Sequence, residues 1–387
     1  MHIRKEIRSL TADQLLALRR SMAELQRREE APSFIDLAGF HGMPRRHCPH
    51  GTPFFLPWHR AYIRMFESEL QSIDPNVTLP FWDWTSIASI AQGMAPAHTD
   101  PTFIDNEIQS NPLASGPIED RSRQTRRTPP HHPHRLRSYA SSVLLAMDNS
   151  DSYLDFNNRL EGPHNSVHVW IGGPQGDMST VSRAAYDPIF WSHHATVDRQ
   201  WAIWQKCNPT RTLPMELLSQ PLPGFSDWTI ADTLDLSSPR LDYTYEGLDE
   251  FSCPLPTRIG AEGSVLFNAR VDTIHDRKPR IVVEIHDVDR EGTSFMVDLF
   301  VRDPSTADRE AFGGSFGIFG AEGLHSAHHG HHHSRKATQH IDITEAVDSL
   351  GLRGRPVEIR LNAINKSGDI VEATSLPIGA LDLRIVP

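Results

Sequence analysis

The chain contains two sets of three histidines with the spacing of metal ligands. The first set lies within FHGMPRRHCPHGTPFFLPWHRAY, and the second lies within LEGPHNSVHVWIGG and DPIFWSHHATVDRQW. Neutral imidazole suits Cu, Zn, Fe and Ni, and three plus three nitrogen ligands without a carboxylate or thiolate favour a copper pair. We therefore predict two copper ions per chain, held by His41, His50 and His59 and by His164, His168 and His194.

Such a site needs uncharged ligands. Carboxylates would make it a harder site that suits other metals, and thiolates would be oxidised by it. A copper pair in which each ion keeps an open position can bind dioxygen, so dioxygen is an expected partner.

Helix signals surround both sets. Thr11 and Gln14 form the pattern of a capping box ahead of leucines with helical spacing. A second helix is predicted to begin near Pro57 and to end at Asp74-Pro75, which places His59 in its first turns.

Two more helices are predicted over residues 158–169 and 187–205. Asp187 is the expected N-cap of the latter, followed by proline at the first helical position. His164 and His168 are four residues apart and should share one helix face. Between the two histidine sets, residues 97–137 are rich in Pro, Ser and Arg, which predicts a long surface loop.

The last third of the chain follows a different pattern. Short alternating runs predict strands without intervening helices: SVLFNARV, PRIVVEIHDV, TSFMVDLFV, ATQHIDIT, VEIRLNAI and LDLRIV. We predict an α-helical bundle that holds the dicopper site over residues 1–248, followed by an all-β sandwich or jelly-roll domain over residues 249–387.

The composition of the chain excludes some classes of binding partner. The 387 residues include 38 Lys and Arg against 49 Asp and Glu, and a net charge of −11 gives no general attraction to nucleic acid or anionic lipid. No stretch approaches a membrane-spanning length, and the segment from Met1 to Glu30 lacks the apolar run of a signal peptide. Three cysteines are too few for a disulfide framework. The expectation is a cytoplasmic or otherwise soluble protein, and the oligomeric state is left open.

The blocks around the histidines resemble the type-three copper proteins, which include tyrosinases, catechol oxidases and molluscan haemocyanins. F-H-G, C-x-H-G, F-x-x-P-W-H-R-x-Y, L-E-G-x-H-N-x-V-H-x-W-x-G-G and D-P-I-F-W-x-H-H-x-x-V-D-R-x-W carry this resemblance, in the family's order, from about Ala38 to Gln205. The stretch FGGSFGIFGAEG is similar to the extra β domain of plant polyphenol oxidases and haemocyanin units. Tyr243-x-Tyr245 is similar to the tyrosine motif that closes the catalytic domain.

The resemblance implies a dicopper phenol oxidase, with dioxygen and a phenolic small molecule as its partners, that hydroxylates monophenols and oxidises o-diphenols to o-quinones. Two alternatives remain open: an o-diphenol or o-aminophenol oxidase without monophenolase activity, and a haemocyanin-like dioxygen carrier. The resemblance and the four-residue spacing to Asp198 favour His194 as the ligand over His193, because adjacent helical residues point about 100° apart.

A cysteine two residues before a copper-bound histidine resembles the C-x-H of fungal tyrosinases and haemocyanins. In those proteins the sulfur is bonded to the imidazole carbon, so a thioether between Cys48 and His50 is implied. The alternative is that Cys48 is a small buried hydrophobic residue.

Four further positions match residues of the family that act around the copper pair. Glu161 and Asn165 match a pair that holds a water for phenol deprotonation, a general-base role. Alternatively, they are a helix-start glutamate and an asparagine that supports a ligand. Val181 matches the gate residue, and Phe319 stands where haemocyanin-like units carry an apolar plug, which implies that the intact chain is latent. An ordinary strand aromatic is the alternative for Phe319.

A histidine-rich run lies between two predicted strands. It is either a site for copper delivery, around His328 to His333, or an adventitious metal-binding loop. Its histidines are His325, His328, His329, His331, His332, His333 and His340.

Overall fold

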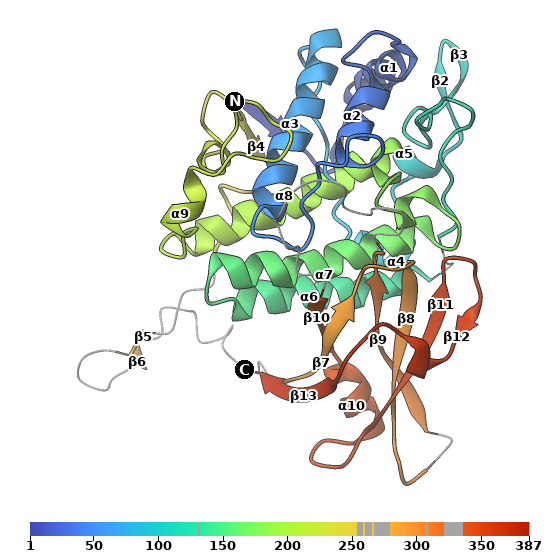
Figure 1. Cartoon of the computed structure of the whole chain (residues 1–387), viewed down its shortest axis with the longest axis vertical. Helices are drawn as coiled ribbons and strands as arrows, with labels where there is room; N and C mark the ends of the chain where they lie inside the picture. The colour runs from blue at the N-terminus through green and yellow to red at the C-terminus, as the bar shows by residue number, and fades with distance from the viewer. Residues whose placement is uncertain are drawn as a thin grey trace.

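The computed structural model describes residues 1–129, 132–253, 258–259, 265–266, 279–306, 309–320 and 336–386. Residues 1–253 build a helical part, and residues 279–386 build a β part that lies against one side of it (Figure 1). This is the predicted order of a helical domain followed by a β-sheet domain.

Four helices carry or support the histidine sets: α2 (Phe34–His41), α3 (Phe55–Ile73), α7 (Tyr153–Gly172) and α8 (Ile189–Cys207). The predicted capping box is present, since Thr11 caps α1 (Ala12–Arg27) and exchanges hydrogen bonds with Gln14. The start of α8 differs slightly from the prediction, because Pro188 occupies the N-cap position and Asp187 accepts the backbone N–H of Ile189 at 3.2 Å. The shorter helices of this part are α4 (Ile87–Gln92), α5 (Pro96–Thr99) and α9 (Met215–Leu218).

The region predicted as a long surface loop is more ordered than expected. It contains α5 and a hairpin formed by β2 (Thr102–Asp105) and β3 (Glu107–Ser110), and it leads into α6 (Leu136–Asn149), which the sequence pattern did not predict. Arg123 and Arg127 reach inward to the buried carboxylates of Asp177 and Asp187. Its polar composition thus reflects ion pairs with the core as well as exposure to solvent.

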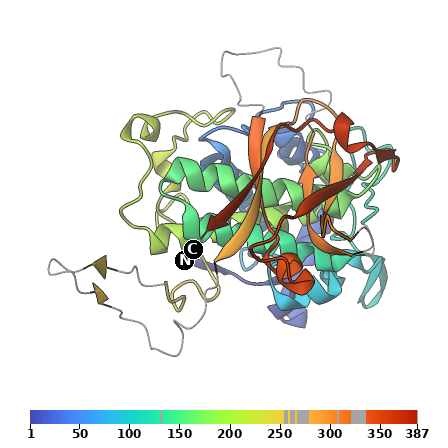
Figure 2. The same ribbon diagram turned by 90° about the horizontal axis from the view of Figure 1, so that it is seen from below.

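The β part contains two sheets in the stretches that the structure describes. One has the order β10 (Lys336–Asp342), β7 (Arg280–Asp289), β13 (Leu381–Val386), and the other has the order β12 (Ile370–Val371), β11 (Glu358–Asn365), β8 (Phe295–Arg302), β9 (Glu310–Ile318). Side chains of both sheets and of α10 (Thr344–Leu350) share one apolar core. The view from below shows these sheets across α6 and α7 (Figure 2). Two short strands, β5 (Arg258–Ile259) and β6 (Val265–Leu266), pair with each other.

The two parts meet through closely packed side chains. Met296 and Phe319 of the β part belong to the apolar core of the helical part. Gly317 on β9 has no room for a side chain, because an added Cβ would lie 2.8 Å from the Cα of Ser166 on α7. The backbone N–H of Gly317 instead donates to Ser166 Oγ at 2.9 Å. This close approach brings the end of β9 over the histidines of α7.

The helical part is closed by strands from its two ends. β1 (His2–Arg4) pairs in parallel with β4 (Tyr243–Tyr245), which contains the predicted tyrosine motif. None of the helices in the described stretches is long and apolar enough to cross a membrane.

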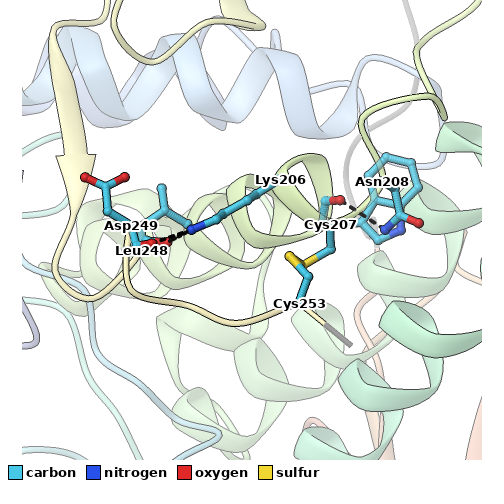
Figure 3. Close-up of a disulfide and its surroundings, with 7 residues drawn as sticks. Lys206, Cys207, Asn208, Leu248, Asp249 and Cys253 are labelled. Atoms are coloured by element: carbon cyan, nitrogen blue, oxygen red, sulfur yellow. Dashed lines mark hydrogen bonds between the residues drawn. A yellow bond between two sulfur atoms is a disulfide. The ribbon is translucent and has the colours of Figure 1, made fainter. Parts of the chain in front are cut away.

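A disulfide joins Cys207 at the end of α8 to Cys253 (Figure 3). Lys206 Nζ also donates to the carbonyl oxygens of Leu248 and Asp249, at 2.7 and 2.6 Å. The sequence reasoning missed this bond, because three cysteines do not indicate which of them pair. The disulfide fastens the segment that leaves the helical part to the helix that carries His194.

Candidate metal centre

The structure brings all six predicted ligands into one buried region. His41 is the last residue of α2, His50 lies in the loop that follows it, and His59 is on α3. His164 and His168 are one turn apart on α7, and His194 is on α8. Gly42, directly after His41, touches the backbone of Ser182 so closely that an added Cβ would lie 2.2 Å from its carbonyl oxygen. This contact fixes the end of α2 beside Val181, which is buried.

The second set converges on a point. The Nε2 atom of His168 lies 3.1 Å from that of His164 and 3.2 Å from that of His194, and the third side of this triangle is 3.3 Å. An ion about 2 Å from each nitrogen fits such a triangle. His193 belongs to the same buried group but stacks on the ring of His164 instead of completing the triangle.

The first set, His41, His50 and His59, lies opposite the second set. Ligand atoms of His41, Cys48 and His50 lie within 4.8 Å of one another. The ring of His59 is 5.5 Å from that of His41 and 5.2 Å from that of His50, between centroids. The two sets also touch, because His59 stacks on His194 at 4.3 Å. Two adjacent ions can therefore be held between α2, α3, α7 and α8.

Hydrogen bonds orient three of the rings for metal binding. The Nδ1 atoms of His59, His164 and His168 face the oxygens Phe55 O at 2.8 Å, Asn165 Oδ1 at 3.0 Å and Met178 O at 3.3 Å. A proton on Nδ1 leaves the lone pair of Nε2 for a metal. Nε2 of His59 is buried and has no hydrogen-bond partner among the described residues, an arrangement that is costly unless a metal takes that lone pair. These residues fit copper.

Burial also keeps the imidazoles neutral. It lowers the pKa of every predicted ligand, and neighbouring imidazoles lower most of them further: His41, His50, His59, His164, His168 and His194. For His59 burial lowers the pKa to about 3. Neutral imidazole is the form that binds copper.

We expect the copper-free protein to lose stability in mild acid. The folded-state pKa of His59 lies below the unfolded value of about 6.5, so the unfolded chain binds the proton more readily between these two values. The contribution is fully present above pH 6.5 and declines by about 1.4 kcal/mol for each unit below it. Urea unfolding at pH 7.5 and 5.5 measures the effect, and equal free energies of unfolding at the two pH values would contradict it.

Cys48 is a free cysteine beside His50. Burial raises the pKa of its thiol to about 12, so the sulfur is a neutral thiol near pH 7 and a poor thiolate ligand. The thioether to the His50 ring stays a prediction, and the structure provides the proximity that it needs.

We expect copper loading in the presence of dioxygen to join Cys48 to His50. The tryptic peptide of residues 47–60 would then be two hydrogens lighter than calculated and would resist thiol reagents after unfolding. The double variant Cys207→Ser/Cys253→Ser leaves Cys48 as the only thiol for this measurement. Protein kept free of copper is the control, and full alkylation of Cys48 in both samples would exclude the bond.

The predicted water-holding pair has partners that the sequence did not indicate. Asn165 Oδ1 orients His164, as described above. The Glu161 carboxylate accepts the N–H of Gly51, 2.9 Å from each oxygen, and forms an ion pair with Arg290 of the β part. Arg290 was not among the predicted site residues, and no local signal in the sequence marks it.

Phe319 lies over the second set. Its ring stacks on that of His168, with centroids 4.4 Å apart and an angle of 8° between the planes. The side chain is 3% exposed, and it also meets His50 edge to face at 6.0 Å. The plug that the sequence implies is therefore in contact with both histidine sets.

A buried polar network supports the helices behind the histidines. Asp198, four residues after His194, accepts the hydroxyls of Tyr243 at 2.5 Å and Tyr245 at 2.6 Å. It also pairs with Arg4, and with Arg60, which directly follows His59. Burial and the Asp198 charge raise the pKa of both tyrosines, so they remain hydrogen-bond donors. The network ties α3 and α8 to β1 and β4.

Most of the histidine-rich run lies outside the described residues: His325, His328, His329, His331, His332 and His333. His340 is on β10, where burial lowers its pKa to about 3. Copper delivery by this run stays a prediction.

Comparisons with known proteins agree with this geometry. Residues 31–207 match the family model of the common central domain of tyrosinase. The chain is 31% identical over 277 residues to haemocyanin beta-C chain unit G of Helix pomatia, a match that covers 64% of this chain and 66% of that unit. It therefore spans slightly less than two thirds of that relative.

Two solved structures are similar over the full length of both chains. A functional unit of octopus haemocyanin superimposes with a TM-score of 0.75 at 23% identity, and the tyrosinase of Burkholderia thailandensis at low pH with a TM-score of 0.72 at 19% identity. At these identities the likeness shows a shared fold.

Proposed function

Because the chain belongs to the type-3 copper protein family, we propose that it binds dioxygen at a dinuclear copper site that its β part keeps closed to phenols. The single observation that carries this proposal is the buried side chain of Phe319, which stacks on His168 of the second set and meets His50 of the first set edge to face. The similarity to a haemocyanin unit supports dioxygen binding over the phenol oxidase reading of the sequence.

Two copper ions, when bound, supply reversible binding of dioxygen and its activation for phenol oxidation. The chain holds the imidazoles for this chemistry neutral and oriented. Phe55, Asn165 and Met178 direct the Nε2 lone pairs of His59, His164 and His168 into the site. Phe319 occupies the space over the second set, and a small diatomic molecule needs far less room there than an aromatic ring.

Phenol oxidation after displacement of Phe319 is the second candidate function. Glu161 and Asn165 favour it, since both lie beside the second set and match the pair that holds a proton-accepting water in tyrosinase-like sites. A phenol must lose its proton near neutral pH to bind copper, and a positioned base promotes that step. Oxygen uptake by the Phe319→Ala variant with a monophenol, an o-diphenol and an o-aminophenol distinguishes an opened site that acts on monophenols from one that acts only on o-diphenols or o-aminophenols.

The disulfide bears on where the protein works. Cytosolic thiols are kept reduced, whereas disulfides persist in oxidising compartments. Of the predicted alternatives, a cytoplasmic or an otherwise soluble protein, the Cys207–Cys253 bond therefore supports a protein of an oxidising compartment over a cytoplasmic one.

One set of measurements tests the proposal. The copper-loaded protein should contain two copper ions per chain, and dioxygen added to its reduced form should produce a strong near-ultraviolet band that disappears when dioxygen is removed. Oxygen uptake with a monophenol, an o-diphenol and an o-aminophenol in parallel should be slow for the intact chain. Zinc or a single copper at full occupancy, without the band, would contradict the proposal. Rapid uptake by the intact chain would favour an open oxidase.

A further inference from the structure

The turn between β7 and β8 places a cation on the predicted base of the site. Arg290 of this turn pairs with Glu161, and the two side chains are only 10% and 4% exposed. The Glu161 carboxylate also accepts the N–H of Gly51, the residue after His50, while Glu161 itself is on the helix of His164 and His168. The ion pair of Arg290 with Glu161 thus connects the β part to the helix that carries His164 and His168. Through the N–H of Gly51, it also connects the β part to the loop that carries His50.

The same turn is held beside the plug. Ser294 Oγ donates to the carbonyl oxygen of Ser179 at 2.7 Å and accepts the N–H of Gly320, the residue after Phe319, at 2.9 Å. Arg290 and Phe319 therefore approach the site from two neighbouring segments that are hydrogen-bonded to each other. The β part therefore binds the Glu161 carboxylate through Arg290 and fills the space over the histidines with Phe319.

We propose that Arg290 is a specificity-determining residue that suppresses reaction with monophenols by occupying the Glu161 carboxylate. This inference rests on the proposed phenol oxidation. In that reaction the phenol O–H proton passes to a water held by Glu161, and the guanidinium competes for the same carboxylate oxygens and stabilises their negative charge. An o-diphenol is easier to deprotonate and depends less on this base. With Arg290 in place, a site opened at Phe319 oxidises o-diphenols and leaves monophenols largely unreacted.

The test uses the full chain with the plug removed. We compare Phe319→Ala, Phe319→Ala/Arg290→Gln and Phe319→Ala/Asp298→Asn, each loaded with copper. Asp298 is the matched control, since it forms another ion pair between the two parts, with Arg135 at 2.8 and 2.6 Å. The Arg290→Gln change should raise the ratio of monophenol to o-diphenol turnover by about tenfold or more, as expected for release of a general base. Asp298→Asn should leave the ratio unchanged, and Arg290→Lys should keep it low because the charge is retained.

A second readout needs no copper. In the copper-free variants, carbodiimide with an amine should label Glu161 faster after Arg290→Gln than after Asp298→Asn, as measured by peptide mass spectrometry. Thermal unfolding of the same samples shows that both variants are folded.

The outcomes separate the two proposals. If all variants oxidise o-diphenol and the turnover ratio is the same for Arg290→Gln and Asp298→Asn, the role of Arg290 is excluded while phenol oxidation stands. If no variant consumes even o-diphenol, phenol oxidation itself is excluded, and the selectivity assigned to Arg290 falls with it.

Discussion

The Phe319→Ala variant is expected to oxidise o-diphenols about 10- to 100-fold faster than the intact chain at low substrate concentration. Burying a phenylalanine side chain stabilises the closed arrangement by about 1.5–3 kcal/mol, and each 1.4 kcal/mol is a factor of ten in an equilibrium. The plug and the site are on one chain, so the substrate competes with an intramolecular ligand. Oxygen uptake below saturation measures the gain, and the near-ultraviolet dioxygen band should remain.

The matched control for this variant is Phe312→Ala. Phe312 is on the same strand, β9, but is 36% exposed and packs against Phe300 and His134, away from the ligand rings. It should leave o-diphenol oxidation unchanged. If the intact chain is already as active as Phe319→Ala, the β part has to be reassigned to assembly, copper loading or stability.

Activation of the protein by a proteolytic cut between its two parts should depend on the disulfide. A cut between residues 248 and 252 leaves the β part tethered through Cys253 to Cys207, so activation should require reduction as well as cleavage. The Cys207→Ser/Cys253→Ser variant should be activated by the same cut without a reductant.

The Asp198→Asn variant is expected to lose about 3–5 kcal/mol of folding free energy, together with copper affinity. Asp198 is buried and pairs with Arg4 and Arg60, and removing the carboxylate of a buried ion pair leaves an uncompensated charge. Urea unfolding of the copper-free protein measures the loss. The effect on copper follows because Arg60 and Asp198 connect the helices of His59 and His194.

Asp105→Asn is the control for the buried network. It removes a carboxylate that pairs with Arg20 at the surface, where the arginine side chain is 58% exposed and water screens the interaction. We expect a much smaller change in stability and unchanged copper binding. Similar losses for the two variants would show that the network around Asp198 has no special part in stability.

Local sequence signals predicted several helices well. The capping box of Thr11 and Gln14 sets the start of α1 through hydrogen bonds within four residues. The spacing of His164 and His168 places them on one face of α7, which the structure confirms. Such signals depend only on residues that are close together along the chain, so the sequence alone is enough to recognise them.

Other elements were missed for physical reasons. α2 is short, although Ser33 and Asp36 form a capping box that could have revealed it. α6 follows a segment rich in Pro and Arg, whose charges are bound by Asp177 and Asp187 from distant parts of the chain. β9 contains several glycines, which are poor strand formers, and Gly317 is required there by the close contact with α7.

The sequence by itself determined the metal chemistry, because two local properties are sufficient for it. The imidazole side chain sets the type of ligand, and helix geometry sets which spacings bring ligands together. Only the tertiary structure decided that His59 stacks on His194, that Phe319 covers His168 and that Arg290 reaches Glu161. These partners are more than 100 residues apart. The contact of His59 with His194 depends on how α3 packs against α8, and the other two contacts depend on how the β part packs against α7. Helix periodicity gives the face on which a side chain lies, but only tertiary packing determines which distant charge or ring meets it.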